Sequence, residues 1–461
     1  MIKALRARHG LAALLVATAL VAAGCSSSDS DSGSNTSAAP DSTAPGTTDG
    51  GSPTGAGDFG DLAEVCGPGS ASGSTDQGVT DNQIVVGTMS DPGNSIVPGL
   101  NQELFDAADA FVGWCNEAGG ILGRQIVLNK RDAKLLEAGP RMVEACQSDF
   151  MLVGNGVALD DTVVEARTGC GLTEIVAFTV SPRAGRAEGS IAANVNSDWM
   201  SHLTGIYRRI KALDPEVVGF YGMLNNQNPA LNTQGKRNAQ AAVDLGFTQV
   251  FYDETPLAVD NWRTYAENIK KAGVQVLSTQ NTPENTAALM RAMADVGYFP
   301  KYLVMEANHY NNKFLEEAGD TVGQTTVLIN SYLTPFEQAS SNPATQQFVD
   351  LVEQYADTEP KAIGVNAFSA WLLWSTAAKA CGSELTRACV MQRATGVTGW
   401  TGGGLHAPDT PQGAAGPNSP CFVAIRATGD GFVIDTETTA ADTGIYNCEP
   451  ANAVQVTGYN P

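Results

Sequence analysis

Two groups of ionisable side chains in this sequence could carry catalysis. Asp160 and Asp161 are adjacent carboxylates, and Glu306 lies three residues before His309. Carboxylate and imidazole groups are common general acids and bases. The two aspartates stand where a helix is expected to start, and a carboxylate stabilises that end of a helix, so capping is the preferred interpretation. Glu306 and His309 follow an expected strand and could face either a cleft or solvent.

Other sequence patterns of enzymes and cofactor sites are missing. The sequence has no GxSxG, GxxxxGK[ST] or HExxH motif. Gly154-Asn155-Gly156 starts like a dinucleotide-binding fingerprint, but it lacks the third glycine, and a strand-to-helix turn favours glycine by itself. No CxxC pair occurs, and His202, His309 and His406 are far apart in the sequence. The sequence therefore predicts no enzyme, no cofactor and no metal site.

Short apolar runs alternate with helical patterns along residues 83–380. Strands are expected at 83–86, 125–128, 151–153, 175–178, 217–221, 249–252, 274–277 and 302–305. Helices are expected at 104–115, 140–147, from 161, and at 199–213, 234–245, 262–271, 283–296, 345–355 and 367–380, the last with Trp371 and Trp374 in the core. This alternation predicts an α/β fold with parallel sheets covered on both faces. About 400 residues exceed one typical core and indicate two lobes.

The segments that follow these strands are the expected ligand-binding region. In open α/β sheets, ligands bind beyond the carboxyl ends of the strands. The segments in question are 90–93, 155–159, 179–181, 225–228, 280–282 and 306–309. Their residues are mostly small and neutral, and none of them pairs a nucleophile with a base. The pattern therefore favours holding a small molecule over reacting with it.

The amino-terminal region has the form of an export signal. A basic start precedes an apolar run at 11–21, which is shorter than the roughly 20 residues of a membrane span. Small residues at 22–24 lead to Cys25, a pattern that resembles the lipobox of bacterial lipoproteins, in which the chain is cut before a cysteine that carries lipid. The alternative is an ordinary cleaved signal with a chance cysteine. Residues 25–74 are rich in Ser, Thr, Gly, Asp and Pro, which predicts a flexible tether.

Eight further cysteines and an acidic composition fit an exported protein. An even number of cysteines predicts disulfides in an oxidising compartment, although eight cysteines allow 105 pairings. Close spacing favours Cys146–Cys170, Cys381–Cys389 and Cys421–Cys448, which leaves Cys66–Cys115. The formal charge of −22, from 27 basic and 49 acidic residues, argues against nucleic acid and against anionic membrane surfaces as partners.

Two stretches carry a resemblance to a known family. Residues 78–87 (GVTDNQIVVG) match the opening pattern GVTD-x-x-I-x-x-G, and residues 111–128 (FVGWCNEAGGILGRQIVL) contain the pattern N-x-x-GGI-x-GR. Segments at 288–297, 314–319 and 367–380 follow in the same order. Over residues 75–461 the chain resembles the substrate-binding lipoproteins of the branched-chain amino acid (leucine/isoleucine/valine-binding) ABC transporters.

This resemblance implies a type I periplasmic-binding fold, with two Rossmann-like lobes joined by three crossovers that close on a ligand. By analogy, 1–24 is a lipoprotein signal peptide, 25–74 the lipidated tether, 75–196 plus 329–420 lobe one, and 197–328 plus 421–461 lobe two. The implied partners are a small molecule and an ABC permease, for a monomer anchored on the outer face of a bacterial cytoplasmic membrane. A ligand-sensing receptor of the same fold, or an extracellular enzyme using Glu306 and His309, are the alternatives.

The resemblance also implies a ligand site and a departure from the family's usual ligand. Amino-acid-binding members hold the carboxylate with hydroxyl side chains, and the matching positions here are Ala158 and Val180. The family's tyrosine-glycine loop is replaced by an Asn-rich segment, and Glu306 matches the ammonium-binding acid. The implied site residues are Asn155, Gly156, Val157, Ala158, Thr179, Val180, Ser181, Asn225, Asn226, Gln280, Asn281 and Glu306. The predicted ligand is therefore an amide or a less polar or aromatic solute rather than a standard branched-chain amino acid.

Overall fold

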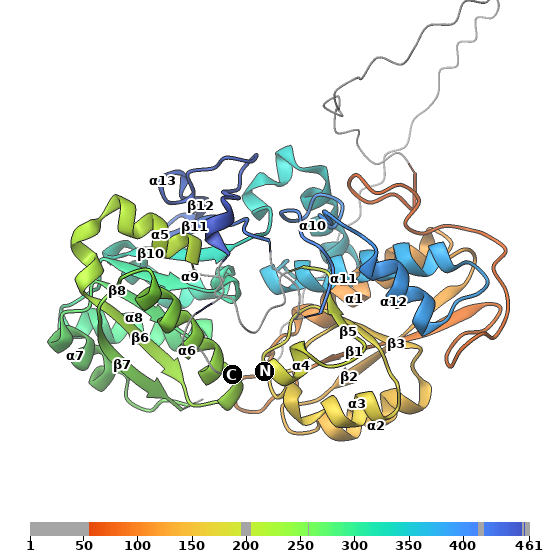
Figure 1. Ribbon diagram of the computed structural model, residues 1–461, viewed down its shortest axis with the longest axis horizontal. Helices are drawn as coiled ribbons and strands as arrows, with labels where there is room; N and C mark the ends of the chain where they lie inside the picture. Colours follow the sequence, from red (N-terminus) through yellow and green to blue (C-terminus); the bar gives the residue numbers. More distant parts are fainter. Residues whose placement is uncertain (1–54, 195–203, 257, 414–418, 454–455, 457–461) are drawn as a thin grey trace, which may run out of the picture. The chain divides into compact units, whose positions relative to one another are not determined.

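The structure of the protein is a computed structural model that describes residues 55–194, 204–256, 258–413, 419–453 and 456. Residues 50–461 form one compact unit, in which two α/β halves can be followed in Figure 1. The predicted signal peptide, Cys25 and residues 25–54 of the predicted tether lie outside the described residues. No helix in the described part is both long and apolar enough to span a membrane.

The first half is built on a five-stranded sheet in the order β2-β1-β3-β4-β5, in which all neighbours are parallel. Its strands are β1 (Gln83–Ser90), β2 (Gln125–Asp132), β3 (Met151–Asn155), β4 (Glu174–Val176) and β5 (Ser190–Ala192). Its helices are α1 (Glu103–Glu117), α2 (Ala138–Ser148), α3 (Val164–Gly169) and α4 (Pro182–Gly185). Ile84 and Val86 of β1 join the apolar cluster that contains α1, whereas Met89 packs with Met142 of α2 on the other face.

The second half is built on a seven-stranded sheet in the order β12-β11-β10-β9-β8-β6-β7, parallel except for β11 and β12. Its strands are β6 (Tyr221–Asn226), β7 (Gln249–Thr255), β8 (Val276–Thr279), β9 (Tyr302–Met305), β10 (Thr326–Ser331), β11 (Val423–Thr428) and β12 (Gly431–Ile434). Its helices are α5 (Thr204–Leu213), α6 (Pro229–Asp244), α7 (Trp262–Ala272), α8 (Pro283–Val296), α9 (Asn312–Ala318) and α13 (Thr436–Thr439). The two sheets confirm the predicted α/β class with parallel central sheets.

Three helices that follow β10 return to the first half. They are α10 (Pro343–Ala356), α11 (Ala362–Cys381) and α12 (Arg387–Thr395). Helices α10 and α11 contact α1, and α11 also contacts β3 and β4. Trp371 and Trp374 are fully buried, as predicted, and Trp371 stacks on Phe111 with ring centroids 5.3 Å apart. The chain then re-enters the second half as β11, so it passes between the halves after β10 and again before β11. The earlier passage, expected near residue 196, falls within 195–203 and lies outside the described residues.

The main difference from the expected strands lies at 217–221. Pro215–Gly219 is a 3₁₀-helix, η2, and the strand begins only at Tyr221. Pro215 occupies the first helical position, where its fixed φ favours a turn. Val217 is buried, but it belongs to this turn and not to a strand. Strands β5, β10, β11 and β12 are additional to the prediction.

The tether prediction needs correction for residues 55–74, which pack against the first half. Phe59 is fully buried, and its ring centroid lies 5.9 Å from that of Trp114 and 4.9 Å from that of Phe368. Trp114 Nε1 donates a hydrogen bond of 2.9 Å to the carbonyl oxygen of Ala56. The polar composition of this stretch concealed one large apolar side chain and one cysteine, Cys66, that hold it on the core.

The three disulfides favoured by close cysteine spacing and the fourth that they left over are all present in the structure. They are Cys66–Cys115, Cys146–Cys170, Cys381–Cys389 and Cys421–Cys448. The first attaches the 55–74 segment to α1, and the third joins α11 to α12. Each bridge therefore links segments that already lie side by side in the fold.

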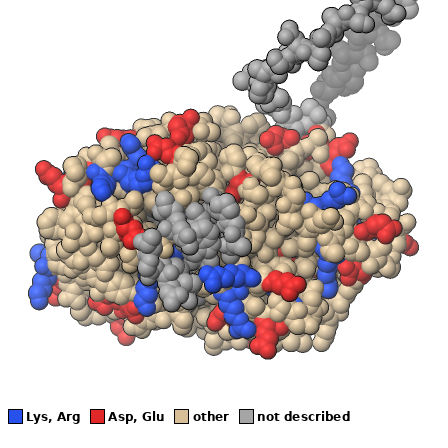
Figure 2. Space-filling model, viewed as in Figure 1, with Lys and Arg blue, Asp and Glu red and all other residues tan. Residues whose placement is uncertain are grey.

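Charged side chains are scattered over the face shown in Figure 2, with acidic and basic groups interspersed among neutral ones. Some of them form exposed ion pairs within one helix, such as Arg263 Nε with Glu267 Oε1 at 2.8 Å in α7. Exposed pairs of this kind contribute little to stability. Interspersed charges of both signs favour solubility, and a phosphate-binding surface needs a basic band instead.

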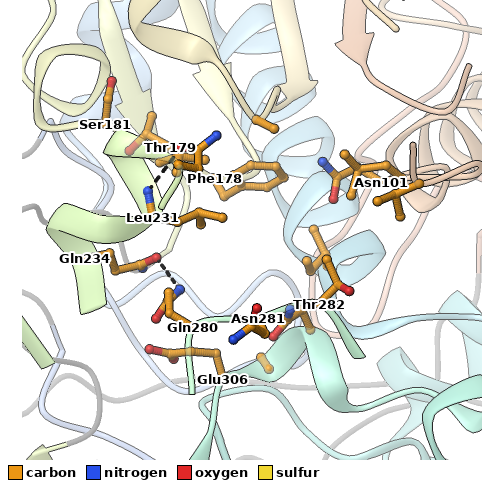
Figure 3. Close-up of a pocket in the computed structure, with 18 of the residues that line it drawn as sticks. Asn101, Phe178, Thr179, Ser181, Leu231, Gln234, Gln280, Asn281, Thr282 and Glu306 are labelled. Atoms are coloured by element: carbon orange, nitrogen blue, oxygen red, sulfur yellow. Dashed lines mark hydrogen bonds between the residues drawn. The ribbon is translucent and has the colours of Figure 1, made fainter. Parts of the chain in front are cut away.

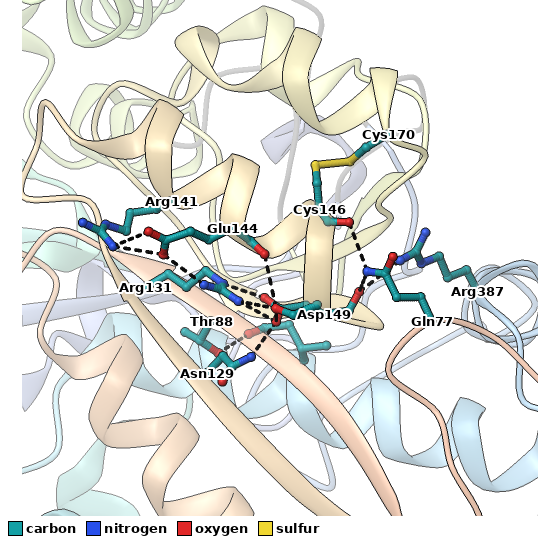
Figure 4. A network of polar contacts seen from close by, with 12 residues as sticks. Gln77, Thr88, Asn129, Arg131, Arg141, Glu144, Cys146, Asp149, Cys170 and Arg387 are labelled. Atoms are coloured by element: carbon teal, nitrogen blue, oxygen red, sulfur yellow. Dashed lines mark hydrogen bonds and ion pairs between the residues drawn. A yellow bond between two sulfur atoms is a disulfide. The ribbon is translucent and has the colours of Figure 1, made fainter. Parts of the chain in front are cut away.

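A buried ion pair joins β2 to Asp149, the residue that follows α2 (Figure 4). Arg131 Nε and Nη2 lie 2.6 and 2.7 Å from the two carboxylate oxygens of Asp149, and Asn129 donates to the same carboxylate at 2.6 Å. A Cβ at Gly87 would lie 2.3 Å from Asp149 Oδ2, so the glycine in β1 makes room for this carboxylate. Arg387 of α12 donates to the carbonyl oxygen of Asp149, which ties the returning helix to the same corner.

A hydrogen-bonded chain runs through the core beside α11. Trp400 Nε1 donates to Ser369 Oγ at 2.9 Å, Ser369 Oγ lies 2.8 Å from His406 Nε2, and His406 Nδ1 lies 2.8 Å from the Ala407 carbonyl oxygen. Because a carbonyl only accepts, Nδ1 carries a proton, and in the neutral ring Nε2 accepts from Ser369. Burial lowers the pKa of His406 from 6.5 to about 4.

Replacing His406 with glutamine is expected to weaken the acid sensitivity of folding. The folded-state pKa lies below the unfolded value, so the folded protein binds fewer protons between pH 6.5 and pH 4. The contribution of neutral His406 to the free energy of unfolding is thus fully present above pH 6.5 and is lost as pH falls to about 4. The loss is about 3 kcal/mol. In urea titrations, the stability advantage of wild type over His406→Gln should fall by that amount from pH 7 to pH 4.

The prediction compares wild type with His406→Gln because other buried groups also titrate between pH 4 and pH 7. Burial raises the pKa of Asp160 to about 7 and that of Asp409 to about 6. Raised carboxylate pKa values make folding more stable as pH falls, the opposite sign to His406. Both aspartates are present in wild type and in the variant, so their effects cancel. Parallel stability curves for the two proteins would contradict the prediction.

Candidate functional site

A cavity of about 270 Å³ lies where strands of both sheets end. Loops after β4, β6, β8, β9 and β10 contribute to its walls, which is the carboxyl-end position expected of a ligand site. This volume lies near the lower end of the roughly 300–1,000 Å³ of small-molecule pockets and fits a small solute. The lining residues are Asn94, Ile96, Val97, Leu100, Asn101, Leu135, Ala158, Phe178, Thr179, Val180, Ser181, Asn228, Leu231, Gln234, Arg237, Gln280, Asn281, Thr282, Glu306, Ala307, Asn308, Asn330, Tyr332, Ile363 and Asn366.

Helix α6 presents one face to this cavity. Asn228, just before the helix, and Leu231, Gln234 and Arg237 follow one another at three-residue spacing, which places them on one side of a helix. Asn226 Oδ1 accepts the backbone N–H of Asn228 at 2.8 Å and fixes the entry to the helix. Figure 3 shows Leu231 pointing into the cavity and Gln234 pointing toward Gln280.

An apolar wall is formed around Phe178, and the two glycines of the Gly154-Asn155-Gly156 turn explain its packing. A Cβ at Gly156 would lie 2.6 Å from Phe178 Cε1, so the bare glycine backbone accommodates the ring. Gly154 has φ +63°, and a Cβ there would lie 2.9 Å from Trp371 Nε1. The glycines are therefore required for close packing, which accounts for the motif without a bound dinucleotide.

Gly156→Ala is expected to lower the free energy of unfolding by about 1–3 kcal/mol, because the added methyl group displaces the Phe178 ring. In a Phe178→Leu background the same change should cost less, with a coupling of about 1 kcal/mol in a urea-unfolding double-mutant cycle. Gly139→Ala in α2 is the matched control, since a Cβ there meets nothing within 4 Å. Additive effects of Gly156→Ala and Phe178→Leu would refute the packing explanation.

The polar wall is largely organised by the second half. Gln280 Nε2 donates to Gln234 Oε1 at 2.7 Å (Figure 3), and Asn281 Oδ1 accepts from Thr255 Oγ1 at 2.8 Å. Asn238 Nδ2 donates to Glu306 Oε1 at 2.9 Å. Burial raises the pKa of Glu306, and the positive charge of nearby Arg237 opposes that shift. The wall is thus a set of oriented amides around one carboxylate.

The residues implied from the sequence divide into three groups. Seven of them line the cavity together, namely Ala158, Thr179, Val180, Ser181, Gln280, Asn281 and Glu306. Asn155, Gly156 and Val157 line a separate space of about 20 Å³ instead. Asn225 and Asn226 are buried outside the cavity lining, where Asn225 Nδ2 donates to Tyr252 OH at 3.0 Å. The last two groups hold the loops in place and do not reach the cavity.

The sequence missed most of the α6 face, the apolar residues at 96–100 and Asn330. Asn330 lies on β10, a strand that the sequence did not indicate. The three-residue spacing of the α6 face was readable, but the predicted helix began at 234, after Asn228 and Leu231. An earlier helix start would have placed both of these residues beside Gln234.

Asp160 and Asp161 do not cap a helix, so the capping prediction is wrong. They lie in the 3₁₀-helix η1 (Asp160–Thr162), which has no side-chain cap. Asp160 instead accepts the backbone N–H groups of Val180 at 2.6 Å and Ser181 at 3.0 Å. Asp160 therefore braces the loop after β4, which forms part of the cavity wall.

Glu306 and His309 are not presented together to the cavity. His309 is buried and is not among the described lining residues, and its Nε2 lies 2.9 Å from Thr286 Oγ1. His309 Nδ1 lies 2.9 Å from Asn308 Oδ1, so both ring nitrogens are used within the fold. Burial lowers its pKa to about 4, which keeps the ring neutral. Among the described residues, no cluster of His, Cys, Asp or Glu could hold a metal ion.

Comparison with known proteins agrees with the two-sheet architecture. Residues 212–430 match the family model described as periplasmic binding protein. A fatty acid ABC transporter substrate-binding protein from Thermomonospora curvata is similar in structure, with a TM-score of 0.67 and 15% identity over 83% of this chain and 97% of that chain. The chain has the fold of the type I periplasmic binding proteins. No curated protein sequence matches it.

Two further solved structures share this type I fold. A leucine-binding protein from Thermotoga maritima has a TM-score of 0.63 and 11% identity, over 76% of this chain and 97% of that chain. A branched-chain amino acid transporter substrate-binding protein from Streptococcus pneumoniae, solved with isoleucine, has a TM-score of 0.61 and 14% identity, over 77% and 99%. The resemblance drawn from the sequence is confirmed at the level of the fold.

Proposed function

We propose that the chain is an extracytoplasmic solute-binding protein that captures one small molecule and delivers it to an ABC importer without chemical change. The observation that carries this proposal is a cavity walled by strand ends of both sheets and lined by oriented amides and apolar side chains. Capture by closure of the two halves is the mode of action that such a site supports. The similar structures titled as ABC transporter substrate-binding proteins add support.

The proposed ligand is an amide or a less polar or aromatic solute rather than a standard branched-chain amino acid. Ala158 and Val180, at the positions where amino-acid binders carry hydroxyl groups, line the cavity with apolar side chains. A buried ligand carboxylate without partners costs several kcal/mol. The similar structures include a fatty acid transporter's protein and one solved with isoleucine, so this fold accommodates chemically different solutes.

The proposal includes a lipid anchor at Cys25 that holds a monomer on the outer face of the cytoplasmic membrane, next to its permease. Support comes from the lipobox-like sequence before Cys25. In cells fed labelled palmitate, wild type should carry label in the membrane fraction, and Cys25→Ala should carry none. An unlabelled wild-type protein would leave an ordinary cleaved signal as the explanation.

A thermal-shift screen of the mature, oxidised chain tests solute binding. The panel contains leucine, isoleucine, valine, short fatty acids, primary amides, polyols and aromatic acids. A ligand at 100 times its Kd adds about 2.7 kcal/mol and raises Tm by a few degrees. At least one solute is expected to do so. Stabilisation by leucine or valine would show that Ala158 and Val180 permit amino-acid binding, and a panel without any stabilising solute would reject the proposal.

A further inference from the structure

Three backbone donors in the first-half wall of the cavity are occupied by the protein's own carboxylates. Ala158 N donates to Asp91 Oδ2 at 2.7 Å, and Val180 N and Ser181 N donate to Asp160 at 2.6 and 3.0 Å. Asp91 and Asp160 are both buried. A ligand anion is normally held by N–H groups of this kind. At these three positions the wall therefore has no backbone donor left for a ligand carboxylate.

The opposite wall differs, because it contains hydrogen-bond acceptors that receive no hydrogen bond from the described residues. Gln280 Oε1 and Asn330 Oδ1 are such atoms, on side chains that are only 9% and 4% exposed. The bond from Gln280 Nε2 to Gln234 Oε1 orients the Gln280 amide and leaves its carbonyl oxygen as the end without a partner (Figure 3). A buried acceptor of this kind costs free energy, which a ligand donor would recover.

Charge at the cavity is compensated within the protein. Glu306 and Arg237 are the two charged residues in the described lining. The charge of Arg237 opposes the rise that burial causes in the Glu306 pKa, and Asn238 donates to the Glu306 carboxylate. The site therefore calls for neither a cationic nor an anionic ligand.

We infer that the cavity selects an uncharged solute with an apolar body and a head group that donates hydrogen bonds, such as a primary amide, over the carboxylate of the same shape. This inference rests on the proposed function and specifies its substrate class. The head donates to Gln280 Oε1 and Asn330 Oδ1, and the body lies against Phe178 and Leu231. A head that only accepts, such as a ketone, would leave both oxygens without partners.

Two sets of nearly isosteric probes test this selection by calorimetric titration of the mature chain at neutral pH. One set is hexanamide, hexanoate and heptan-2-one, and the other is phenylacetamide, phenylacetate and phenylpropan-2-one. In at least one set the amide is expected to bind about tenfold more tightly than either counterpart. A carboxylate or ketone that binds as tightly as its amide would overturn the inference and leave solute capture intact. If no probe of either set binds, the inference is overturned. Solute capture itself would be overturned only if no solute of the thermal-shift panel raised Tm as well.

Variants of the two acceptor residues test where the head group binds. Gln280→Met and Asn330→Leu each remove one acceptor at similar volume, and each should reduce the amide-to-ketone affinity ratio by about fivefold. Leu231→Ala is the control, because it removes apolar contact from all three probes of a set and should preserve the ratio. If neither acceptor variant changed the ratio, the placement of the head group would be wrong.

Discussion

Replacing Asp149 with alanine is expected to lower the free energy of unfolding by about 3–5 kcal/mol. The carboxylate has no exposed surface and forms a two-pronged pair with Arg131, at 2.6 and 2.7 Å. Removing it would leave the Arg131 guanidinium buried beside Asn129, with only the exposed Glu144 as a compensating charge. The corner that β2, β3 and α12 share would lose its central acceptor (Figure 4).

Urea unfolding at pH 7 measures this loss, and Glu144→Ala is the matched control. Glu144 also pairs with Arg131, at 3.2 Å, but its side chain is 47% exposed, so its removal should cost less than about 1 kcal/mol. Adding Arg131→Met to Asp149→Ala should recover part of the stability, because the unpaired charge is then gone. Equal costs for Asp149→Ala and Glu144→Ala would mean that burial does not strengthen the pair.

The α/β class was predictable because most of the parallel strands, although not β5 and β10, were predicted from a local signal of their own. The run 83–86 is apolar in every residue after Gln83, and a helix such as 283–296 carries Pro at its first position and ends before a glycine. Strands β11 and β12 were not predicted, because these antiparallel additions at the sheet edge lie outside the alternation of strands and helices. Val217 shows the limit of local signals, because a preceding proline converted an apolar run into a turn.

The lining residues of the cavity were predictable where their position after a strand was enough to place them there. Loops after β4, β8 and β9 had to meet at one edge of their sheets, and Thr179, Gln280 and Glu306 do line the cavity. Whether a side chain in such a loop faces the cavity or the scaffold depends on packing. Asn225 faces inward to Tyr252 because the chain turns into α6 immediately afterwards, a contact that spacing along the sequence does not encode.

The role of Asp160 could not be derived from its position in the sequence. An acidic pair at the start of a helix predicts capping, because the nearest unsatisfied N–H groups belong to that helix. In the folded chain the loop after β4 brings the N–H groups of Val180 and Ser181 to the same carboxylate. A partner 20 residues away replaced the local one, and it determines how the cavity wall is built.

Removing the Cys66–Cys115 disulfide by a double replacement with alanine is expected to cost about 4 kcal/mol. The bridge spans a sequence separation of 49 residues, so its loss gives the unfolded chain considerable conformational freedom. The double variant of Cys381 and Cys389 is the matched control, because that bridge spans only 8 residues and should contribute about 2.5 kcal/mol. Urea unfolding of the two variants measures the difference.

This pair of variants also separates two ways in which residues 55–74 are held. With the bridge gone, noncovalent contacts must keep the segment on the core. They are the ring contacts of Phe59 with Trp114 and Phe368, the buried Val65 side chain and backbone hydrogen bonds such as Gly67 N to Gly120 O. Limited proteolysis should then cleave within 55–74 faster than in wild type, whereas the control variant should show no change there. If cleavage stays slow and the stability loss does not exceed that of the control, the noncovalent contacts are sufficient, and the disulfide contributes no more than its shorter counterpart.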